Sequence, residues 1–383
     1  MDFDLSEEQR LLRESVGKLL AAHYDTLEAR KGYQAEPDGF SRAIWNEFAE
    51  AGLLALPFSE ADGGFGAGAV ETMLVMEQLG AALAIEPYLS ASVLCGALLR
   101  DTASPDMKAR LLPGMISGET LLALAQTEPD LRGALHEAAL TARPTPEGYV
   151  LNGRKSMVMG GGTADLFIVV ARGTGTPRDE TGLSLLLVEG TSSGLTRQAY
   201  PTQDGFQAAT IDFENVLVPR ANLIGQEGQG LAPLRRAVEE ATAALCAEAV
   251  GAMAALLNLT VEYLRTRKQF GVALGSFQAL QHRAVDMYVA LEQARSMAIY
   301  AALAIVEDDP SMRSAAIAAA KAQIGHSALL IGETATQLHG GIGLTMEYKG
   351  AHYFKRLIMI ERQFGDSGAH LRALAHQGGL IAA

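Results

Sequence analysis

The sequence predicts an α+β protein whose chain runs through a helical part, a β part and a second helical part. Two changes of pattern indicate this order. Apolar residues at helical spacing give way after about residue 120 to short runs that alternate every second residue, and long Ala- and Leu-rich stretches return from about residue 230. With 383 residues, 49% of them hydrophobic, the chain is long enough for several packed units. We expect an α-helical domain at 1–118, a β domain at 119–228 and a helical-bundle domain at 229–383.

The first domain is expected to begin with a capped helix. Ser6 is followed three residues later by Gln9, which forms a capping box ahead of apolar residues at helical spacing. The stretch PFSEADGGFGAG favours a loop because of its Pro and Gly residues. Helical patterns continue on both sides of it, through SRAIWNEFAEAGLLAL, VETMLVMEQLGAAL and MKARLLPGMISGETLLALA.

The β domain and the last domain differ in the length of their apolar runs. The β domain has short strand-like runs punctuated by Gly, Pro, Asn and Asp, namely YVLNGRK, LFIVVAR, LSLLLVEG and ATIDFENVLVP. The last domain has two much longer helical patterns, AVEEATAALCAEAVGAMAALLNLTVEYLRTRKQF and SFQALQHRAVDMYVALEQARSMAIYAALAIV. Such lengths are typical of the antiparallel helices of a bundle.

Charge and composition disfavour several kinds of partner. The formal net charge of -13, from 44 acidic and 31 basic residues, repels phosphate backbones and anionic lipids. No apolar run reaches the roughly 20 residues needed to cross a bilayer, and the first residues lack the pattern of a signal peptide. Cys95 and Cys246 form no CxxC pair, and the eight histidines form no HxxxH or HxH cluster. We therefore expect a cytoplasmic protein without a nucleic-acid, membrane or metal partner.

Two long motifs in the last domain indicate a family. RKQFGVALGSFQALQHRAVDM places an Arg and a Lys at a helix end, a Phe-Gly turn, and then Phe277 and Gln278 at the start of the next helix. QLHGGIGLTMEYKGAHYFKR adds a helix that ends in two glycines, where a ligand can approach the backbone closely. In this order and at this separation both motifs resemble the acyl-CoA dehydrogenase family, and the resemblance covers the whole chain. The segments DFDLSEEQRLL, YPTQDG and FGD further resemble the small subunits of pimeloyl-CoA dehydrogenases.

The resemblance implies a fold and an activity. The fold would be an N-terminal helical domain, a middle β-barrel or sandwich domain and a C-terminal four-helix bundle. The cofactor would be FAD, and the reaction would be α,β-dehydrogenation of an acyl-CoA thioester, in which a carboxylate removes the α proton while the β hydride passes to flavin N5. A dicarboxyl-CoA such as pimeloyl-CoA is one substrate to expect. The implied partners are an electron-transferring flavoprotein and further subunits, in a homotetramer or in a heterotetramer with a large subunit.

The resemblance also assigns residues to FAD. Arg267 and Gln278 would meet the FAD diphosphate of a neighbouring subunit, since a guanidinium forks onto phosphate oxygens. The adenosine side would contact Gln337, Gly340 and Gly341, and Phe270 would pack on the adenine or support the turn. Plainer alternatives are a helix-end cation for Arg267, core packing for Phe270 and Phe277, and a helix C-cap for the glycines.

In the β domain, two stretches that would contact the flavin differ from the sequence typical of the family. The family loop TEPGAGSD reads TEPDLRGALHE here, with Thr127 and Glu128 retained. The later Trp-[Ile/Val]-[Ser/Thr] stretch reads KSMVMGGG, so that Met157 stands at the Trp and Met159 at the hydroxyl residue. Methionine can fill space beside a ring but cannot donate the family's hydrogen bond to flavin N5.

The residue at the position of the catalytic base also differs from the family. Matching Arg372 to the Arg of the family's YEGTSxIQR run puts Phe364 at the Tyr and Gly365 at the catalytic Glu. The position on the preceding long helix where some members carry the Glu instead is Ala241.

Three carboxylates lie near these two positions. Asp366 follows Gly365 directly and is either the base or the N-cap of a helix. Glu248 lies two turns beyond Ala241 on nearly the same helix face and is either the base or part of a buried network. Glu240 is rotated by roughly 100° from Ala241 and is expected to be solvated.

Two functions follow from these alternatives. The chain is either an acyl-CoA dehydrogenase subunit that takes part in FAD-dependent oxidation, alone or with a large subunit, or a non-catalytic small subunit that completes the FAD site of a large-subunit partner. A carboxylated substrate would need a cation, for which the candidates by position are His339, His352, Lys355 and Arg356.

Overall fold

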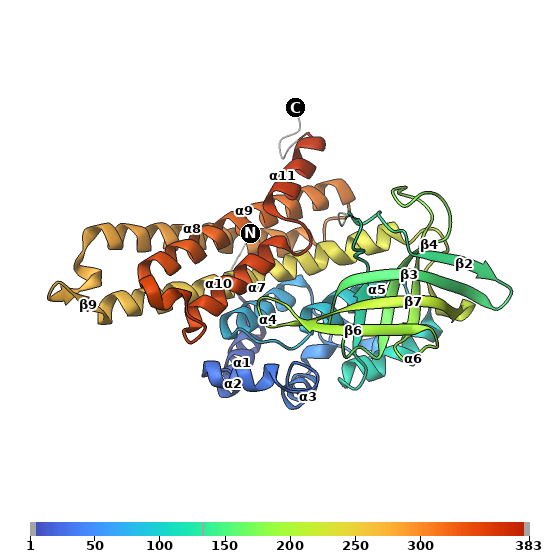
Figure 1. Cartoon of the computed structure of the whole chain (residues 1–383), viewed down its shortest axis with the longest axis horizontal. Coiled ribbons are helices and arrows are strands. Elements are labelled where there is room, and N and C mark those ends of the chain that lie inside the picture. The colour runs from blue at the N-terminus through green and yellow to red at the C-terminus, as the bar shows by residue number, and fades with distance from the viewer. Residues whose placement is uncertain (1–4, 132–133, 379–383) are drawn as a thin grey trace. The chain divides into compact units, whose positions relative to one another are not determined.

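A computed structural model of the chain describes residues 5–131 and 134–378 (Figure 1). The chain folds into two compact units. The first contains Met1–Gly32, Ala69–Ala84 and Thr242–Ala383, and the second contains Tyr33–Gly68 and Ile85–Ala241. The N-terminal helices are thus divided between the units, so the compact units do not coincide with the three expected domains.

The first unit is helical. It is built around α9, which packs against α8, α10 and α11, and Figure 1 shows α8 and α9 running side by side. Its elements are α1 (Glu7–His23), α4 (Ala69–Ala82), most of α7 (Leu231–Thr266), the hairpin of β9 (Lys268–Gln269) and β10 (Val272–Ala273), α8 (Gln278–Ala304), α9 (Pro310–His339), α10 (Lys349–Arg362) and α11 (Ser367–His376). Helix α2 (Leu27–Gln34) begins in this unit.

Local signals place several helix ends as expected. The capping box at α1 is confirmed, because the Ser6 hydroxyl accepts from the Gln9 amide and the Gln9 side chain accepts from the Ser6 amide. Helix α9 starts after Asp309, whose carboxylate accepts from the Ser311 amide, and it ends at Gly340.

Close approach of backbones joins α4 to α7. A Cβ at Gly80 would lie 2.0 Å from the Glu248 carbonyl oxygen, and one at Gly251 would lie 1.8 Å from the Glu77 carbonyl oxygen. Only glycine fits at these two positions, so the two helices pack through their backbones.

The second unit combines short helices with one sheet. The helices are α3 (Arg42–Glu50), a π-helical segment (Tyr88–Cys95), α5 (Gly96–Thr102) and α6 (Pro105–Ile116). The strands are β1 (Leu122–Ala125), β2 (Thr141–Thr145), β3 (Gly148–Met159), β4 (Leu166–Arg172), β5 (Leu183–Glu189), β6 (Leu195–Pro201), β7 (Gln207–Pro219) and β8 (Leu223–Ile224). They pair in the order β6-β7-β3-β2-β4-β5-β8, with β1 beside β4. The core of the sheet includes the fully buried side chains of Tyr149 and Phe167.

The helix, sheet and helix order is confirmed, but two boundaries were wrong. The helical pattern predicted through LLALA ends at Ile116, and Leu122–Ala125 forms β1 because it pairs in parallel with β4. The long helix predicted to include RKQF ends at Thr266, since the next residues pair as a hairpin. In both places pairing with another segment overrides the local helical pattern.

Helix α7 is long and apolar enough, by length and composition, to cross a membrane. However, 72% of its most apolar stretch is buried within the fold. This burial is typical of the central helix of a folded domain, which needs apolar residues on every side.

Candidate functional site

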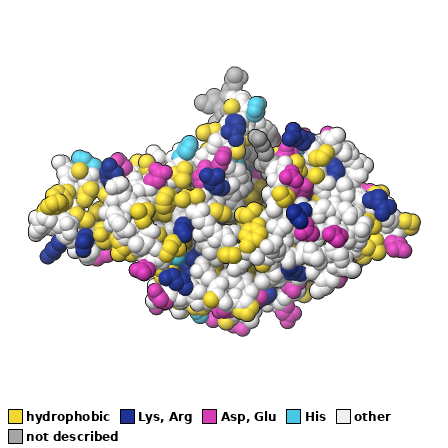
Figure 2. All heavy atoms as spheres, in the orientation of Figure 1, with side chains coloured by type: hydrophobic (Ala, Val, Ile, Leu, Met, Phe, Trp, Pro, Cys, Tyr) yellow, Lys and Arg dark blue, Asp and Glu magenta, His cyan; other side chains and the backbone are white. Residues whose placement is uncertain are grey.

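The hairpin after α7 carries an exposed aromatic side chain on a strained backbone. Phe270 and Gly271 form the turn between β9 and β10, with φ values of 54° and 84°. Phe270 is 90% exposed, and its ring meets Phe277 edge-on at a centroid distance of 6.2 Å. Apolar side chains gather at this end of the molecule (Figure 2). A bulky residue at positive φ is a strained conformation that clusters at functional sites.

Two polar residues of this motif, Arg267 and Gln278, have exposed side chains. The main chain of Arg267 is held, because its amide donates to the Tyr263 carbonyl and its carbonyl accepts from the Leu274 amide. Its guanidinium is exposed and makes no hydrogen bond or ion pair to any residue that the structure describes. Gln278, the first residue of α8, is also exposed.

The end of α9 presents bare backbone. Gly340 has a φ of 66°, and a Cβ at Gly340 or Gly341 would meet no atom within 4 Å. Gln337, in the last turn of α9, is exposed. The space beside the two glycines is therefore open to a ligand.

An aromatic cluster supports this turn. The buried ring of His339 lies 4.7 Å from the Tyr263 ring and 4.8 Å from the Tyr348 ring, between centroids. Its Nδ1 lies 2.8 Å from the Ala335 carbonyl, and the Tyr263 hydroxyl donates to the His339 carbonyl. Burial lowers the pKa of His339, so the ring is neutral and packs the helix end.

Two further candidate cations, His352 and Arg356, make contacts within the protein. His352 Nε2 bonds the Met346 carbonyl, and burial lowers the pKa of His352. Arg356 is buried and paired with Glu248. Lys355 remains half-buried, and its ammonium makes no hydrogen bond or ion pair within the described ranges.

The β domain brings Thr127 and Met157 together at a β-bulge. Lys155 pairs with Ile211 and Val158 pairs with Ala209, so two residues of β3 oppose one of β7. The amide of Ser156 donates to the Thr127 carbonyl at 2.9 Å.

Met157 adopts a φ of 51° in this bulge and is 42% exposed. Its amide donates to the Tyr200 hydroxyl at 3.1 Å, while Met159, at the end of β3, is half-buried. Sequence reasoning missed Tyr200, whose only signal was its place in YPTQDG.

A buried ion pair anchors the Thr127 segment. The Lys155 ammonium donates to Glu128 Oε1 at 2.7 Å and to the Gln126 carbonyl at 3.0 Å. The Glu128 carboxylate also accepts from the amides of Ala139 and Leu140. Burial lowers the pKa of Lys155 to about 8, and the Glu128 charge opposes this shift. These bonds hold the loop that carries Thr127 against β3.

At the family's base position, Gly365 has a φ of 102° and the preceding Phe364 a φ of 60°. Asp366 is the N-cap of α11, since its Oδ1 accepts from the Ala369 amide at 2.7 Å. The buried Lys321 ammonium donates to the carbonyls of Gly365 and Glu361 at 2.9 and 2.8 Å. The loop before α11 is therefore fixed through its main chain, and the Asp366 carboxylate has a structural role there.

His370 lies where a side chain at position 365 would begin. A Cβ at Gly365 would lie 3.1 Å from His370 Nε2, which itself lies 3.1 Å from the Phe364 carbonyl. Burial and the Lys321 charge lower the pKa of His370 to about 4, so the ring is neutral near pH 7. Neither Lys321 nor His370 could be found from motif spacing, because their contacts depend on packing.

Glu248 and Glu240, two of the glutamates of α7, are both in ion pairs. Glu248 accepts from Arg356 through both oxygens, at 2.5 and 2.8 Å, and both side chains are buried. The expectation that Glu240 is solvated was wrong: it is buried and accepts two hydrogen bonds from Arg100, at 3.0 and 2.8 Å. Glu240 points about 100° away from Ala241 around the helix axis. It is nevertheless buried, because this part of α7 is buried on several sides.

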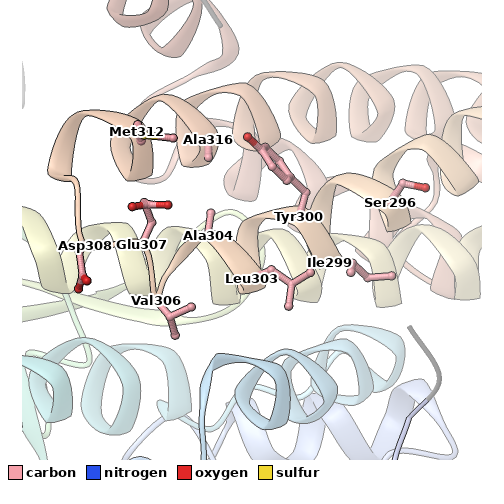
Figure 3. Close-up of a pocket in the computed structure, with 10 residues that line it drawn as sticks. All are labelled: Ser296, Ile299, Tyr300, Leu303, Ala304, Val306, Glu307, Asp308, Met312 and Ala316. Carbon is pink, nitrogen blue, oxygen red and sulfur yellow. The ribbon is translucent and has the colours of Figure 1, made fainter. Parts of the chain in front are cut away.

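A cavity of about 900 Å³ lies at the end of α8 and the start of α9 (Figure 3). Its lining is mainly apolar, with Glu307 and Asp308 at the connection of the two helices. The residues that line it are Ser296, Ile299, Tyr300, Leu303, Ala304, Val306, Glu307, Asp308, Met312 and Ala316. None of the candidate site residues is among them.

The helical unit has an open Gly-Gly turn and an exposed Arg at its motif positions, and the second unit has a β-bulge at Met157; these features are typical of a ligand-binding protein. Models of the N-terminal, middle and C-terminal domains of acyl-CoA dehydrogenases match residues 6–119, 123–216 and 228–378. The chain therefore belongs to the acyl-CoA dehydrogenase family, whose members are flavin-dependent oxidoreductases acting on CH–CH bonds.

Individual relatives agree with this family. The chain is 30% identical to an L-prolyl-[peptidyl-carrier protein] dehydrogenase of a Serratia species over 99% of both chains. It is similar to the solved FAD complex of PigA, with 28% identity, a TM-score of 0.90 and coverage of 99% and 100%. It is also similar to a chain of the ChsE4-ChsE5 complex of Mycobacterium tuberculosis, with 26% identity, a TM-score of 0.87 and full coverage of both chains.

The residues present fit FAD, the cofactor of this family. Open backbone at Gly340 and Gly341 leaves room for a ligand, and the unpaired Arg267 guanidinium suits a diphosphate. In the β domain, the bulge at Met157 is the kind of local irregularity that directs groups at a bound ligand.

Proposed function

We propose that this chain acts in the FAD-dependent α,β-dehydrogenation of an acyl-CoA thioester as a subunit without its own base. The observation that carries the proposal is the state of the carboxylates near the base positions. Asp366 caps α11, and Glu248 is held by Arg356 through both oxygens. A general base must reach the proton that it removes, and these two carboxylates are engaged elsewhere. The base would therefore come from a large-subunit partner.

The chain's own role is to bind FAD. Bound FAD would accept the hydride removed from the β carbon of the substrate. Arg267 and Gln278 would hold the diphosphate of a neighbouring subunit's FAD, beside Phe270. The turn at Gln337, Gly340 and Gly341 would receive the adenosine side, and Thr127, Met157 and Met159 would lie at the flavin ring.

The assembly would be a tetramer, and the heterotetramer with a large subunit fits the missing base better than the homotetramer. Two solved relatives are named as pairs of proteins, the ChsE4-ChsE5 complex and a Tcur3481-Tcur3483 steroid enzyme. Their names support two-subunit assembly. Helix α8 also carries an exposed apolar stripe that would suit a subunit contact: Val285, Tyr288, Val289, Tyr300 and Leu303. With 100° of rotation per residue around the helix axis, all five side chains fall within about 60° on either side of one direction. They therefore share one face of α8.

The substrate would be an acyl-CoA, with a dicarboxyl-CoA such as pimeloyl-CoA as the specific case. The Lys355 ammonium makes no hydrogen bond or ion pair to any residue in the described part of the chain, and such an ammonium can pair with a terminal carboxylate. Electrons would leave the flavin to an electron-transferring flavoprotein in the cytoplasm.

The test is a comparison of the chain alone with its two-subunit complex. Each preparation is examined for bound flavin by its absorption spectrum and for turnover with a panel of acyl-CoA and dicarboxyl-CoA thioesters and an artificial electron acceptor. We expect turnover only from the complex. Turnover by the chain alone would contradict the proposal, and its loss in Asp366→Asn would favour the second candidate, a self-sufficient dehydrogenase with Asp366 as base.

A further inference from the structure

Strand register places Tyr200 on the same face of the sheet as Met159, which stands at the position of the hydroxyl that the family uses at the flavin. Met159 of β3 is opposite Ala208 of β7, and Ala208 is opposite Tyr200 of β6. Figure 1 shows these three strands side by side. Residues directly opposite on neighbouring strands project from the same face of a sheet. Tyr200 and Met159 therefore share a face, two strand spacings or roughly 10 Å apart at the backbone.

The Tyr200 side chain spans this gap. Its hydroxyl accepts from the Met157 amide, which belongs to β3, so the side chain reaches from β6 across β7. The small side chain of Ala208 lies between the two outer positions and leaves room for this. The phenol oxygen thus lies at the bulge, next to the stretch that would face the flavin.

The hydrogen of this hydroxyl is left for another partner. A phenol both accepts and donates, and here the acceptor function is used by the Met157 amide. The Tyr200 hydroxyl donates to no residue that the structure describes, and the side chain is half-buried. A donor in this state is available to a ligand.

We propose that Tyr200 donates to the flavin the hydrogen bond that Met159 cannot donate. This inference rests on the proposed function, because it requires FAD at this face of the β domain. The bulge supports it: Met157 has a positive φ there, and its amide donates to the phenol oxygen, which holds that oxygen at β3 and leaves the hydroxyl hydrogen for another acceptor. Tyr200 would then restore, from another strand, a donor that the local sequence has lost.

The first experiment compares Tyr200→Phe with the unchanged protein, in the preparation that carries flavin. We measure FAD affinity by fluorescence titration of the flavin-depleted protein, and the midpoint potential of the bound flavin by dye equilibration. Loss of one neutral hydrogen bond is expected to weaken FAD binding on the order of fivefold. The midpoint potential is expected to fall, because a donor stabilises the negative charge that reduction places on the flavin. Tyr149→Phe is the matched control, since the Tyr149 hydroxyl donates to Glu227 in the same domain.

A rescue variant separates a flavin contact from mere support of the bulge. Met159→Thr returns a hydroxyl to the family's position, and in the Tyr200→Phe background it is expected to restore affinity and potential. A purely structural role of Tyr200 would not be rescued in this way. Unchanged affinity and potential in Tyr200→Phe, or a loss that Met159→Thr does not repair, would overturn the inference. If no preparation of the chain or its complex contains FAD, the proposed function itself fails, and the inference fails with it.

Discussion

Replacing Glu248 with Gln separates two roles for this residue, a buried ion pair and a catalytic base. Glu248 and Arg356 are only 5% and 3% exposed, and the carboxylate accepts two hydrogen bonds from the guanidinium. Removing one partner of a buried pair leaves the other charge uncompensated, at a cost of about 3–5 kcal/mol. Because Gln keeps an oxygen that can accept one of the two bonds, we expect the lower end of this range, about 3 kcal/mol.

Urea unfolding measures this change. With a dependence of about 3 kcal/mol per molar urea for a large domain, the midpoint is expected to fall by about 1 M. Glu292→Gln is the control, because its pair with Arg295 on α8 is exposed. Such a pair contributes only about 0.2–0.5 kcal/mol. An unchanged midpoint in Glu248→Gln together with lost turnover would refute the ion-pair role and identify Glu248 as the base.

Substitutions at three other residues test the site. Phe270→Ala is expected to weaken FAD binding while changing stability by less than about 0.5 kcal/mol, because the ring is 90% exposed; a large fall in the urea midpoint with unchanged FAD affinity would contradict this. Burial and the Lys321 charge hold the pKa of His370 at about 4, below the ordinary histidine value of 6.5. The unfolded chain therefore binds a proton first as the pH falls from 6.5 toward 4, and stability is lost over that window. His370→Gln should reduce the difference between urea midpoints at pH 7 and pH 5, whereas the exposed His282→Gln should not. Asp366→Ala should lose about 1 kcal/mol with the cap, and Asp366→Asn should keep it; both should leave turnover of the two-subunit complex unchanged, and lost turnover in a stable Asn variant would restore Asp366 as base.

Much of the fold could be predicted because its signals are local. The capping box at Ser6 and the two glycines after α9 act within a few residues of where they stand. The hydrophobic period distinguishes the long helices of the last region from the short strands of the sheet, because burial of one face requires that period. The exposed positions of Arg267 and Gln278 also follow from the motif that ends one helix and begins the next.

The failures share one cause. Leu122–Ala125 reads as helix locally and is a strand because β4 lies beside it. Glu240 lies one residue from a buried position and was expected in solvent, yet Arg100 pairs with it from 140 residues away. Composition and periodicity carry no information about such partners.

The sequence by itself determined the family, the order of helices and strands, and the absence of the usual Glu and hydroxyl at positions 365 and 159. Only the tertiary structure decided which groups lie beside those two positions. His370 and Lys321 surround Gly365 because α9 packs against α11. Tyr200 reaches the bulge in β3 because the register of β6, β7 and β3 aligns three residues from distant parts of the chain. Register and packing arise from burial of the whole core, and a contact between distant residues is fixed only when that core has formed.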